Sequence, residues 1–323
     1  MQHLTRTLPA SWYRSEPLYQ LERRAVLLKS WYLLGPLTRF KPGSSVQYEF
    51  GQVPITVRKS SSSPDLSSEG ITVVSDQDGT SLRHHVTPTG LVFSTISASA
   101  PTFHNFFPDL EPLLARVDFT RLPHRRSIKY EGNFNWKTMV DGYQECLHCQ
   151  YTHPSFSVLY PPTFYAVENH VNFSQHIADP AKREDGLFLY FFPLETLNVY
   201  GGGMSSFRVC PTEKPGVTRM EFDYYHLEDA DSAKFEEYFK FVRQVALEDF
   251  ELCEKAQENL EKGVYNEGIL NPVKENGVAF YQQQILERVT AQYEMEKSAM
   301  TATENQSPDA SMAVGAKSVQ AAA

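Results

Sequence analysis

The sequence predicts an α+β fold, in which a curved antiparallel sheet wraps around a long helix. Two observations support this prediction. Segments between residues 127 and 226 have the aromatic and β-branched content of strands, and residues 232–262 carry an apolar stripe at helical spacing. The predicted strands of this sheet are Ser127–Glu131, Phe164–Glu168, Val171–His176, Leu187–Phe192, Met204–Val209 and Thr218–His226.

Shorter elements precede this sheet. A capping hydroxyl at Ser15 and a proline at Pro17 predict the start of a helix, and Trp31–Gly35 is predicted to be a strand. The serine-rich stretch 59–70 is too polar to pack and is predicted to be a flexible connector. Further strands are expected over 46–50, 53–58 and 91–96, and further helices over 136–150, 232–262 and 278–295.

These patterns divide the chain into three parts. Residues 1–110 form an N-terminal helix and a small β region, and residues 111–297 form the main α+β domain. Residues 298–323 are rich in alanine and serine and show no periodicity, so we predict a disordered tail there.

Composition and charge narrow the classes of function. The chain has 323 residues and a net charge of -9 without a basic cluster, so a nucleic acid or an anionic membrane surface would repel most of it. The sequence has no run of about 18 apolar residues that would span a membrane, and no apolar signal core follows its first residues. We therefore expect a cytoplasmic protein that acts on a small molecule.

The four cysteines are too few for a secreted disulfide scaffold of this size and are typical of a reducing compartment. Cys146 and Cys149 have the spacing of a zinc or thiol-exchange pair, but no second pair has zinc-finger spacing. Small buried packing groups are therefore the favoured interpretation of these two thiols.

Acidic and histidine side chains gather near the middle of the chain. Helical spacing would put Asp141, Glu145 and His148 on one face, at i, i+4 and i+7. His153 lies about 140° further round an ideal helix than His148, so both imidazoles reach one point only if the helix ends between them. Pro154 supports such an end.

The helix predicted over 232–262 carries one charge in its apolar stripe, at Asp249. A buried carboxylate is costly unless a cation or several hydrogen-bond donors meet it. Two histidines and one carboxylate form the facial ligand set of oxygen-activating iron(II) enzymes, because three protein ligands leave three positions open. The stripe consists of Phe235, Tyr238, Val242, Val245, Asp249, Leu252, Cys253, Ala256 and Leu260.

Each of these polar residues also has a simpler interpretation. The acidic helix face is more often a solvated surface than a metal site. Asp249 could pair with Arg219 or Arg243, and His153 could cap a turn. The residues alone leave these alternatives open.

The segment Asn135–Pro154 resembles the iron-binding signature of the α subunits of Rieske-type ring-hydroxylating oxygenases, in particular the branch of choline and glycine-betaine monooxygenases. Far downstream, Glu248–Gln257 resembles the third-ligand helix of the same family, and both signatures occur in the expected order. The residues that carry the resemblance are Asn135-Trp136-Lys137, Asp141, Tyr143, Glu145-Cys146, His148-Cys149, His153-Pro154 and, downstream, Glu248-Asp249 with Gly263-Val264-Tyr265.

This resemblance implies roles for individual residues. It implies that His148, His153 and Asp249 bind iron. It also implies that Glu145 links these ligands to the cluster of a neighbouring subunit in a homotrimer, and that Asp141 is a second acidic residue of the signature. We therefore treat Glu145 and Asp141 as candidate catalytic residues.

The resemblance also implies a fold. Residues 111–297 would form a helix-grip (START/Bet v 1-like) catalytic domain, a seven-stranded type of antiparallel sheet around a long helix. The N-terminal helix, Val53–Arg58 and Thr87–Ile96 resemble outer pieces of the Rieske domain. Residues 1–110 would then be a truncated, vestigial Rieske-like β region.

The chain departs from the family pattern in two ways. Gly142 stands where asparagine is usual and Leu147 where an aromatic residue is usual, which indicates altered surroundings of the metal. A Rieske cluster needs two cysteines and two histidines, and no cysteine precedes Cys146. His84 and His85 cannot replace the missing thiolates. We therefore expect Fe²⁺ and no [2Fe–2S] cluster.

The function that follows is a non-haem iron(II) mono- or dioxygenase that uses O₂ on a small organic molecule. Its electrons would come from a reductase, a cluster-bearing partner subunit or the substrate. Two alternatives are a non-redox metal-dependent isomerase or lyase, and a cluster-less regulatory pseudo-subunit or shortened gene model of a Rieske oxygenase. The aromatic strand Phe188–Phe192, with Tyr200 and Phe207, would line an apolar pocket or form an aromatic cage for a quaternary ammonium group. The favoured interpretation is that these side chains fill the core of the sheet.

Overall fold

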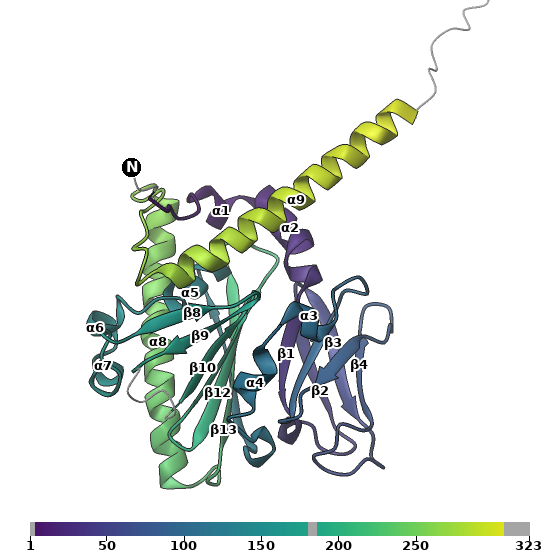
Figure 1. Cartoon of the computed structure of the whole chain (residues 1–323), viewed down its shortest axis with the longest axis vertical. Helices are drawn as coiled ribbons and strands as arrows, with labels where there is room; N and C mark the ends of the chain where they lie inside the picture. The colour runs from purple at the N-terminus through teal and green to yellow at the C-terminus, as the bar shows by residue number, and fades with distance from the viewer. Residues whose placement is uncertain (1–3, 180–185, 307–323) are drawn as a thin grey trace, which may run out of the picture.

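The computed structural model describes residues 4–179 and 186–306. Two three-stranded antiparallel sheets lie in the N-terminal region, with the orders β1-β6-β5 and β2-β3-β4 (Figure 1). The strands are β1 (Trp31–Pro36), β2 (Ser45–Phe50), β3 (Val53–Lys59), β4 (Ile71–Ser75), β5 (Arg83–Val86) and β6 (Leu91–Thr95).

A seven-stranded antiparallel sheet forms the second region, in the order β7-β13-β12-β11-β10-β9-β8. The α+β prediction, with its antiparallel sheet and long helix, is therefore confirmed. The strands are β7 (His124–Gly132), β8 (Ala166–Asn169), β9 (Phe173–Ile177), β10 (Leu187–Phe191), β11 (Glu195–Tyr200), β12 (Gly203–Pro211) and β13 (Thr218–His226).

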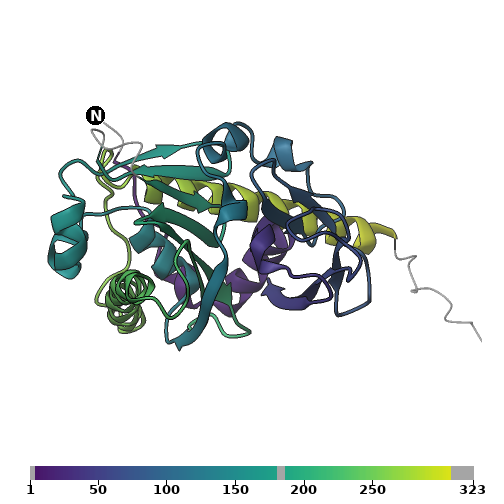
Figure 2. The same ribbon diagram turned by 90° about the horizontal axis from the view of Figure 1, so that it is seen from below.

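The 29-residue helix α8 runs beside this sheet, and Figure 2 looks almost along its axis. The side chain of Ser232 accepts a hydrogen bond from Phe235 N and so caps the start of α8. Apolar side chains of α8 such as Phe235 and Val242 share one core with Phe222 and Tyr224 of β13. The helices are α1 (Ser11–Arg14), α2 (Glu16–Ala25), α3 (Phe103–Phe106), α4 (Leu110–Leu114), α5 (Trp136–Tyr143), α6 (Cys149–Thr152), α7 (Pro154–Leu159), α8 (Ala233–Glu261) and α9 (Asn276–Gln306).

Several element predictions need correction. The strands β4, β5 and β11 were not predicted, and the serine-rich stretch 60–70 is the loop of the β3–β4 hairpin. The helix α9 extends to Gln306 and packs against α2, so residues 298–306 are helical although they were assigned to the disordered tail. The remainder of that tail lies outside the described residues. Long as α8 and α9 are, no helix in the described ranges combines enough length with enough apolar character to cross a bilayer.

A buried ion pair joins the N-terminal region to the second region. Lys137 Nζ of α5 lies 2.8 Å from the carboxylate of Glu22 of α2, and both side chains are fully buried. Trp136 Nε1 donates a 3.3 Å hydrogen bond to the same carboxylate. A second polar link connects the sheets, because Leu33 N of β1 donates to the carboxylate of Glu195 on β11. The two regions therefore share polar contacts that neither could satisfy alone.

Candidate metal centre

The helix α5 ends before the first histidine of the group, His148. Asn135 caps α5 by accepting a hydrogen bond from Lys137 N, and α5 ends at Tyr143. The predicted helix 136–150 is therefore wrong beyond Tyr143. The physical reason lies in Glu145, whose carboxylate accepts a hydrogen bond from Leu147 N and so offers that main-chain group an alternative to the helix.

A second short helix separates the two histidines. The helix α6 begins at Cys149, directly after His148, and His153 is both the last cap of α6 and the first of α7. Pro154 occupies the first turn of α7, where a missing N–H costs nothing. As expected, a helix ends between the two imidazoles, because α6 ends at Thr152. A second helix end, that of α5 at Tyr143, lies before His148 and was not expected.

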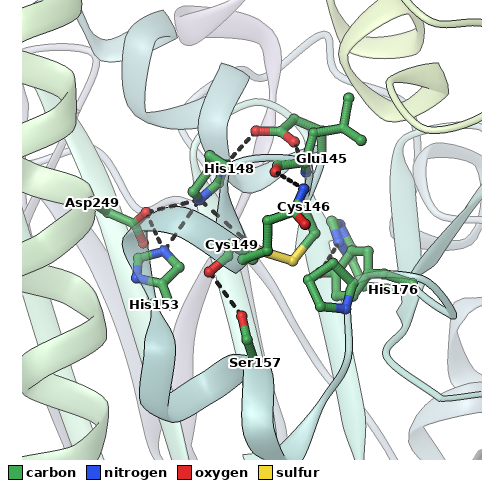
Figure 3. Close-up of a disulfide and its surroundings, with 12 residues drawn as sticks. Glu145, Cys146, His148, Cys149, His153, Ser157, His176 and Asp249 are labelled. Carbon is green, nitrogen blue, oxygen red and sulfur yellow. Dashed lines mark hydrogen bonds and ion pairs between the residues drawn. A yellow bond between two sulfur atoms is a disulfide. The ribbon is translucent and has the colours of Figure 1, made fainter.

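These turns bring three side chains together (Figure 3). His148 Nε2 lies 3.2 Å from His153 Nε2, and Asp249 Oδ1 of α8 lies 3.3 Å from the first and 2.9 Å from the second. Ligand atoms that bind one ion at about 2.1 Å and at right angles are about 3 Å apart. The three atoms thus have the spacing of one face of an octahedral metal site.

A further carboxylate supports each histidine from behind. Glu145 hydrogen-bonds to His148 Nδ1, and Glu248 Oε2 lies 2.8 Å from His153 Nδ1. A proton held on Nδ1 leaves the lone pair of Nε2 directed at the shared point, which is how carboxylates orient metal-binding imidazoles. Glu248 was not predicted as a site residue. Its contact depends on the position of His153, which is distant in the sequence, and the apolar stripe of α8 singled out only Asp249.

The electrostatics of the cluster favour a cation. Burial by itself would lower the pKa of His148, but Asp249 and Glu145 raise that pKa to about 10. Burial would raise the pKa of Asp249, whereas its hydrogen bonds with His148 and His153 lower that pKa to about 2. Three carboxylates around two imidazoles therefore hold excess negative charge. Both the donor set and this charge fit a divalent iron ion.

The two cysteines beside His148 form a disulfide, Cys146–Cys149, which the favoured interpretation as separate packing groups did not include. Both residues are buried, as expected. The turn after Tyr143 brings their Cα atoms to 5.1 Å, within the usual range for a disulfide. Cys149 Sγ lies 3.9 Å from His148 Nε2, so the disulfide is part of the wall of the centre.

Asp141 lies apart from the three converging side chains. Its carboxylate accepts hydrogen bonds from Tyr13 Oη at 2.7 Å, from Gln282 Nε2 at 2.6 Å and from Tyr281 Oη. Burial raises the pKa of Asp141 to about 6, although these three donors oppose the rise. The residue therefore ties α5 to α1 and α9, and the helix face that it was predicted to share with His148 ends at Tyr143.

Two cavities meet at the converging side chains. One, of about 110 Å³, is mainly apolar, and the other, of about 470 Å³, opens between α5 and α8. Both are lined by His148 and Asp249. Phe188, Tyr200 and Phe207 line the smaller cavity, whereas the rest of the aromatic strand 188–192 is buried in the core. Both interpretations of this strand are therefore partly correct. The other aromatic residues of the smaller cavity are Tyr143, Phe156, Tyr165 and Phe222.

Solved structures share this architecture. The quaternary ammonium Rieske monooxygenase CntA in complex with L-carnitine superposes with a TM-score of 0.73 at 18% identity, over 88% of this chain and 96% of that chain. Naphthalene 1,2-dioxygenase from Rhodococcus sp. bound to indole gives a TM-score of 0.64 at 12% identity, over 88% and 94% of the two chains. At these identities the likeness establishes the fold.

The sequence itself identifies the family. No curated protein matches the chain significantly. The family described as "Ring hydroxylating alpha subunit (catalytic domain)" matches residues 119–184 and 172–291, which together cover more than half of the chain. The converging histidines and aspartate all lie within the matched residues. The chain is therefore a member of the ring-hydroxylating oxygenase α-subunit family and contains the catalytic domain of that family.

Proposed function

We propose that this protein is a non-haem iron(II) oxygenase whose metal ligands are His148, His153 and Asp249. One observation carries the proposal: the two Nε2 atoms and Asp249 Oδ1 lie within 3.3 Å of one another although they come from segments about a hundred residues apart in the chain. The membership of an oxygenase family supports the same conclusion. Fe²⁺ held by three protein ligands would supply open positions at which O₂ is activated.

The chain's own residues orient the ligands and exclude water. Glu145 and Glu248 hold the Nδ1 protons of the two imidazoles and keep their Nε2 atoms directed at the ion. The aromatic walls of the 110 Å³ cavity restrict access of water to the reacting atoms. Asp141 acts as a positioning residue, because its hydrogen bonds fix α5 to α9 rather than contacting the converging atoms.

The proposed substrate is a small molecule with an apolar or cationic portion. The smaller cavity offers aromatic rings on several sides, and Phe188 and Tyr200 are stacked with their centroids 5.6 Å apart. Aromatic faces accommodate both apolar groups and quaternary ammonium groups. Trimethylammonium compounds and small aromatic compounds are therefore the first two classes to screen for turnover.

The electrons are proposed to come from outside the chain. The fold family uses a Rieske cluster, but residues 1–110 contain no cysteine, so they do not offer the two thiolates that such a cluster needs. A reductase or a cluster-bearing partner subunit that docks near Glu145, which lines the 470 Å³ cavity, would replace it. This assignment makes residues 1–110 a vestigial Rieske-like region and residues 111–297 the catalytic domain, in a protein that assembles as a homotrimer.

The test combines iron binding with O₂-dependent turnover. The purified full chain, loaded anaerobically with Fe²⁺, should bind one ion at the centre and convert a substrate from the screen only when O₂ and a reductant are both present. Asp249→Asn should abolish both properties. Glu251→Gln, on an exposed position of the same helix, is the matched control and should retain both. Full iron binding by Asp249→Asn would contradict the ligand assignment.

A non-redox reaction is the second candidate, and the cysteine-free N-terminal region favours it. An ion with open positions can polarise a carbonyl group without any electron donor. Turnover of the same substrate in the absence of O₂ and reductant would establish this alternative, whereas strict dependence on both would exclude it. Iron binding without turnover of any screened compound would favour a regulatory subunit.

A further inference from the structure

A second group of metal-ligating side chains lies in the N-terminal region. His85 belongs to β5, His104 to α3 and Glu111 to α4, so three elements each contribute one residue. The helices α3 and α4 form the connection between the small sheets and the seven-stranded sheet (Figure 1). This group shares no residue with the centre described above.

The donor atoms of this group face one another. His85 Nε2 lies 2.8 Å from one carboxylate oxygen of Glu111, and His104 Nε2 lies 3.3 Å from the other. One donor atom from each of the three side chains lies within 4.8 Å of the other two. Donors bound to one tetrahedral ion at about 2.1 Å are about 3.4 Å apart, so only a small movement separates this arrangement from a closed site.

A closed site requires a rotation of His104, which is the most exposed of the three side chains. The His104 side chain is 63% exposed, whereas those of His85 and Glu111 are 23% and 26% exposed. The His85 ring stacks on Phe103 with the centroids 4.1 Å apart, and Phe103 is buried in the core between the two regions. Two donors are therefore held in place, and a rotation of His104 would close the third side.

The charge around the group suits a cation. Glu111 provides one negative charge between two imidazoles. The neighbouring Arg83 guanidinium is turned away, because it donates hydrogen bonds to the carbonyl oxygens of Ser97 and Ala100 and lies over the ring of Trp31. Two imidazole nitrogens, one carboxylate oxygen and room for water form a ligand set that Zn²⁺ and related first-row divalent ions bind.

We propose that His85, His104 and Glu111 bind Zn²⁺, and that this ion fastens β5 to the α3–α4 connection. The role is structural, since the ion would join a small sheet to the segment that leads into the catalytic domain. The proposal is independent of the proposed oxygenase function, because the residues of the two sites are different.

The test counts Zn²⁺ equivalents by calorimetry on the full chain, produced without a histidine tag and freed of metal with a chelator. The wild-type protein should bind two equivalents of Zn²⁺, and each of the single variants His104→Ala and His148→Ala should bind one. The double variant His104→Ala/His148→Ala should bind none. His84→Ala is the matched control, since His84 is an exposed histidine of the same strand whose side chain points to the opposite face, and it should bind two equivalents. Because His104 is exposed, its substitution does not disturb the core.

A second readout separates binding from adventitious contact. Zn²⁺ should raise the thermal midpoint of the His148→Ala variant and should leave that of the double variant unchanged, because an ion that bridges folded elements stabilises only the folded state. Two equivalents bound by His104→Ala, or one equivalent bound by the wild type and none by His148→Ala, would overturn the proposal. Neither result depends on catalytic activity.

Discussion

The two regions of the molecule hold similar donor sets in different surroundings. In the catalytic domain, His153 is 2% exposed and each imidazole has a carboxylate of its own behind it. In the N-terminal region a single carboxylate, that of Glu111, contacts both His85 and His104. The residue types alone therefore do not define the chemistry of either group. Burial and the carboxylates behind the imidazoles would suit the first group to the proposed catalytic ion and the second to the proposed structural ion.

The largest expected effect is the loss of iron from the catalytic domain alone. Asp249→Asn removes the carboxylate charge beside the two imidazoles. We expect iron affinity to fall at least about a hundredfold, because the site would lose a ligand and not only a supporting hydrogen bond. Zn²⁺ binding at the N-terminal group should not change. Titration of the variant with Fe²⁺ measures the iron affinity, and titration with Zn²⁺ measures binding at the N-terminal group. An equal loss at both sites would show that the substitution unfolds the protein instead.

The next effect concerns the ion pair that joins the regions. Lys137→Met leaves the fully buried Glu22 carboxylate without its cation, and we expect the free energy of unfolding to fall by about 3–5 kcal/mol. The double variant Glu22→Gln/Lys137→Met should recover most of that loss, because no charge remains buried. Urea unfolding of both variants measures the difference. If the two regions unfolded in separate transitions in the wild type, the pair would not couple them.

Glu145 and Glu248 should show a smaller effect. Replacing either with glutamine weakens the hydrogen bond that holds an Nδ1 proton, and we expect iron affinity to fall about 10–100-fold. Glu145→Gln should also slow electron delivery if the acid connects the centre to a partner, so its turnover should fall more than its iron affinity. Glu248→Gln should lower turnover only through its weaker iron binding. At saturating iron, Glu248→Gln should therefore regain most of the wild-type turnover, whereas Glu145→Gln should remain slow.

The smallest effect is a pH dependence at the contact between the sheets. Burial raises the pKa of Glu195 from 4.5 to about 8, so the folded state binds this proton more tightly than the unfolded state. The contribution to stability is complete below about pH 4.5 and is lost as the pH rises towards 8. Glu195→Gln should therefore stabilise the protein relative to wild type at pH 8 by at least about 1 kcal/mol more than at pH 5. Thermal unfolding at both pH values measures this, and an equal difference at both would contradict the buried acid.

The main elements could be predicted from the sequence where a long periodic pattern was present. The stripe that contains Asp249 predicted α8 to within one residue at each end, and the aromatic segments predicted most strands of the large sheet. The strand β4 was not predicted although Ile71, Val73 and Val74 carry a strand signal, because it is only five residues long and directly follows a polar stretch. The strand β5 has two histidines in four residues, and its pairing with β6 decides its structure.

The sequence predicted which three side chains would converge, but not which groups would contact them. His148, His153 and Asp249 were expected from residue type, helix geometry and resemblance. Glu248 and the Cys146–Cys149 pairing were not, because both depend on the double turn after Tyr143. That turn depends on a side chain bonded to the main chain at Glu145, which periodicity does not detect.

We expect the catalytic domain to hold iron and the N-terminal region to carry no iron–sulfur cluster. The most direct measurement is the ratio of iron to acid-labile sulfide in the full chain, purified anaerobically and supplied with Fe²⁺. We expect one iron ion per chain and no sulfide, with no visible absorption of a [2Fe–2S] centre. Three iron ions with two sulfides per chain would contradict the account, and so would the failure of the chain to retain any iron.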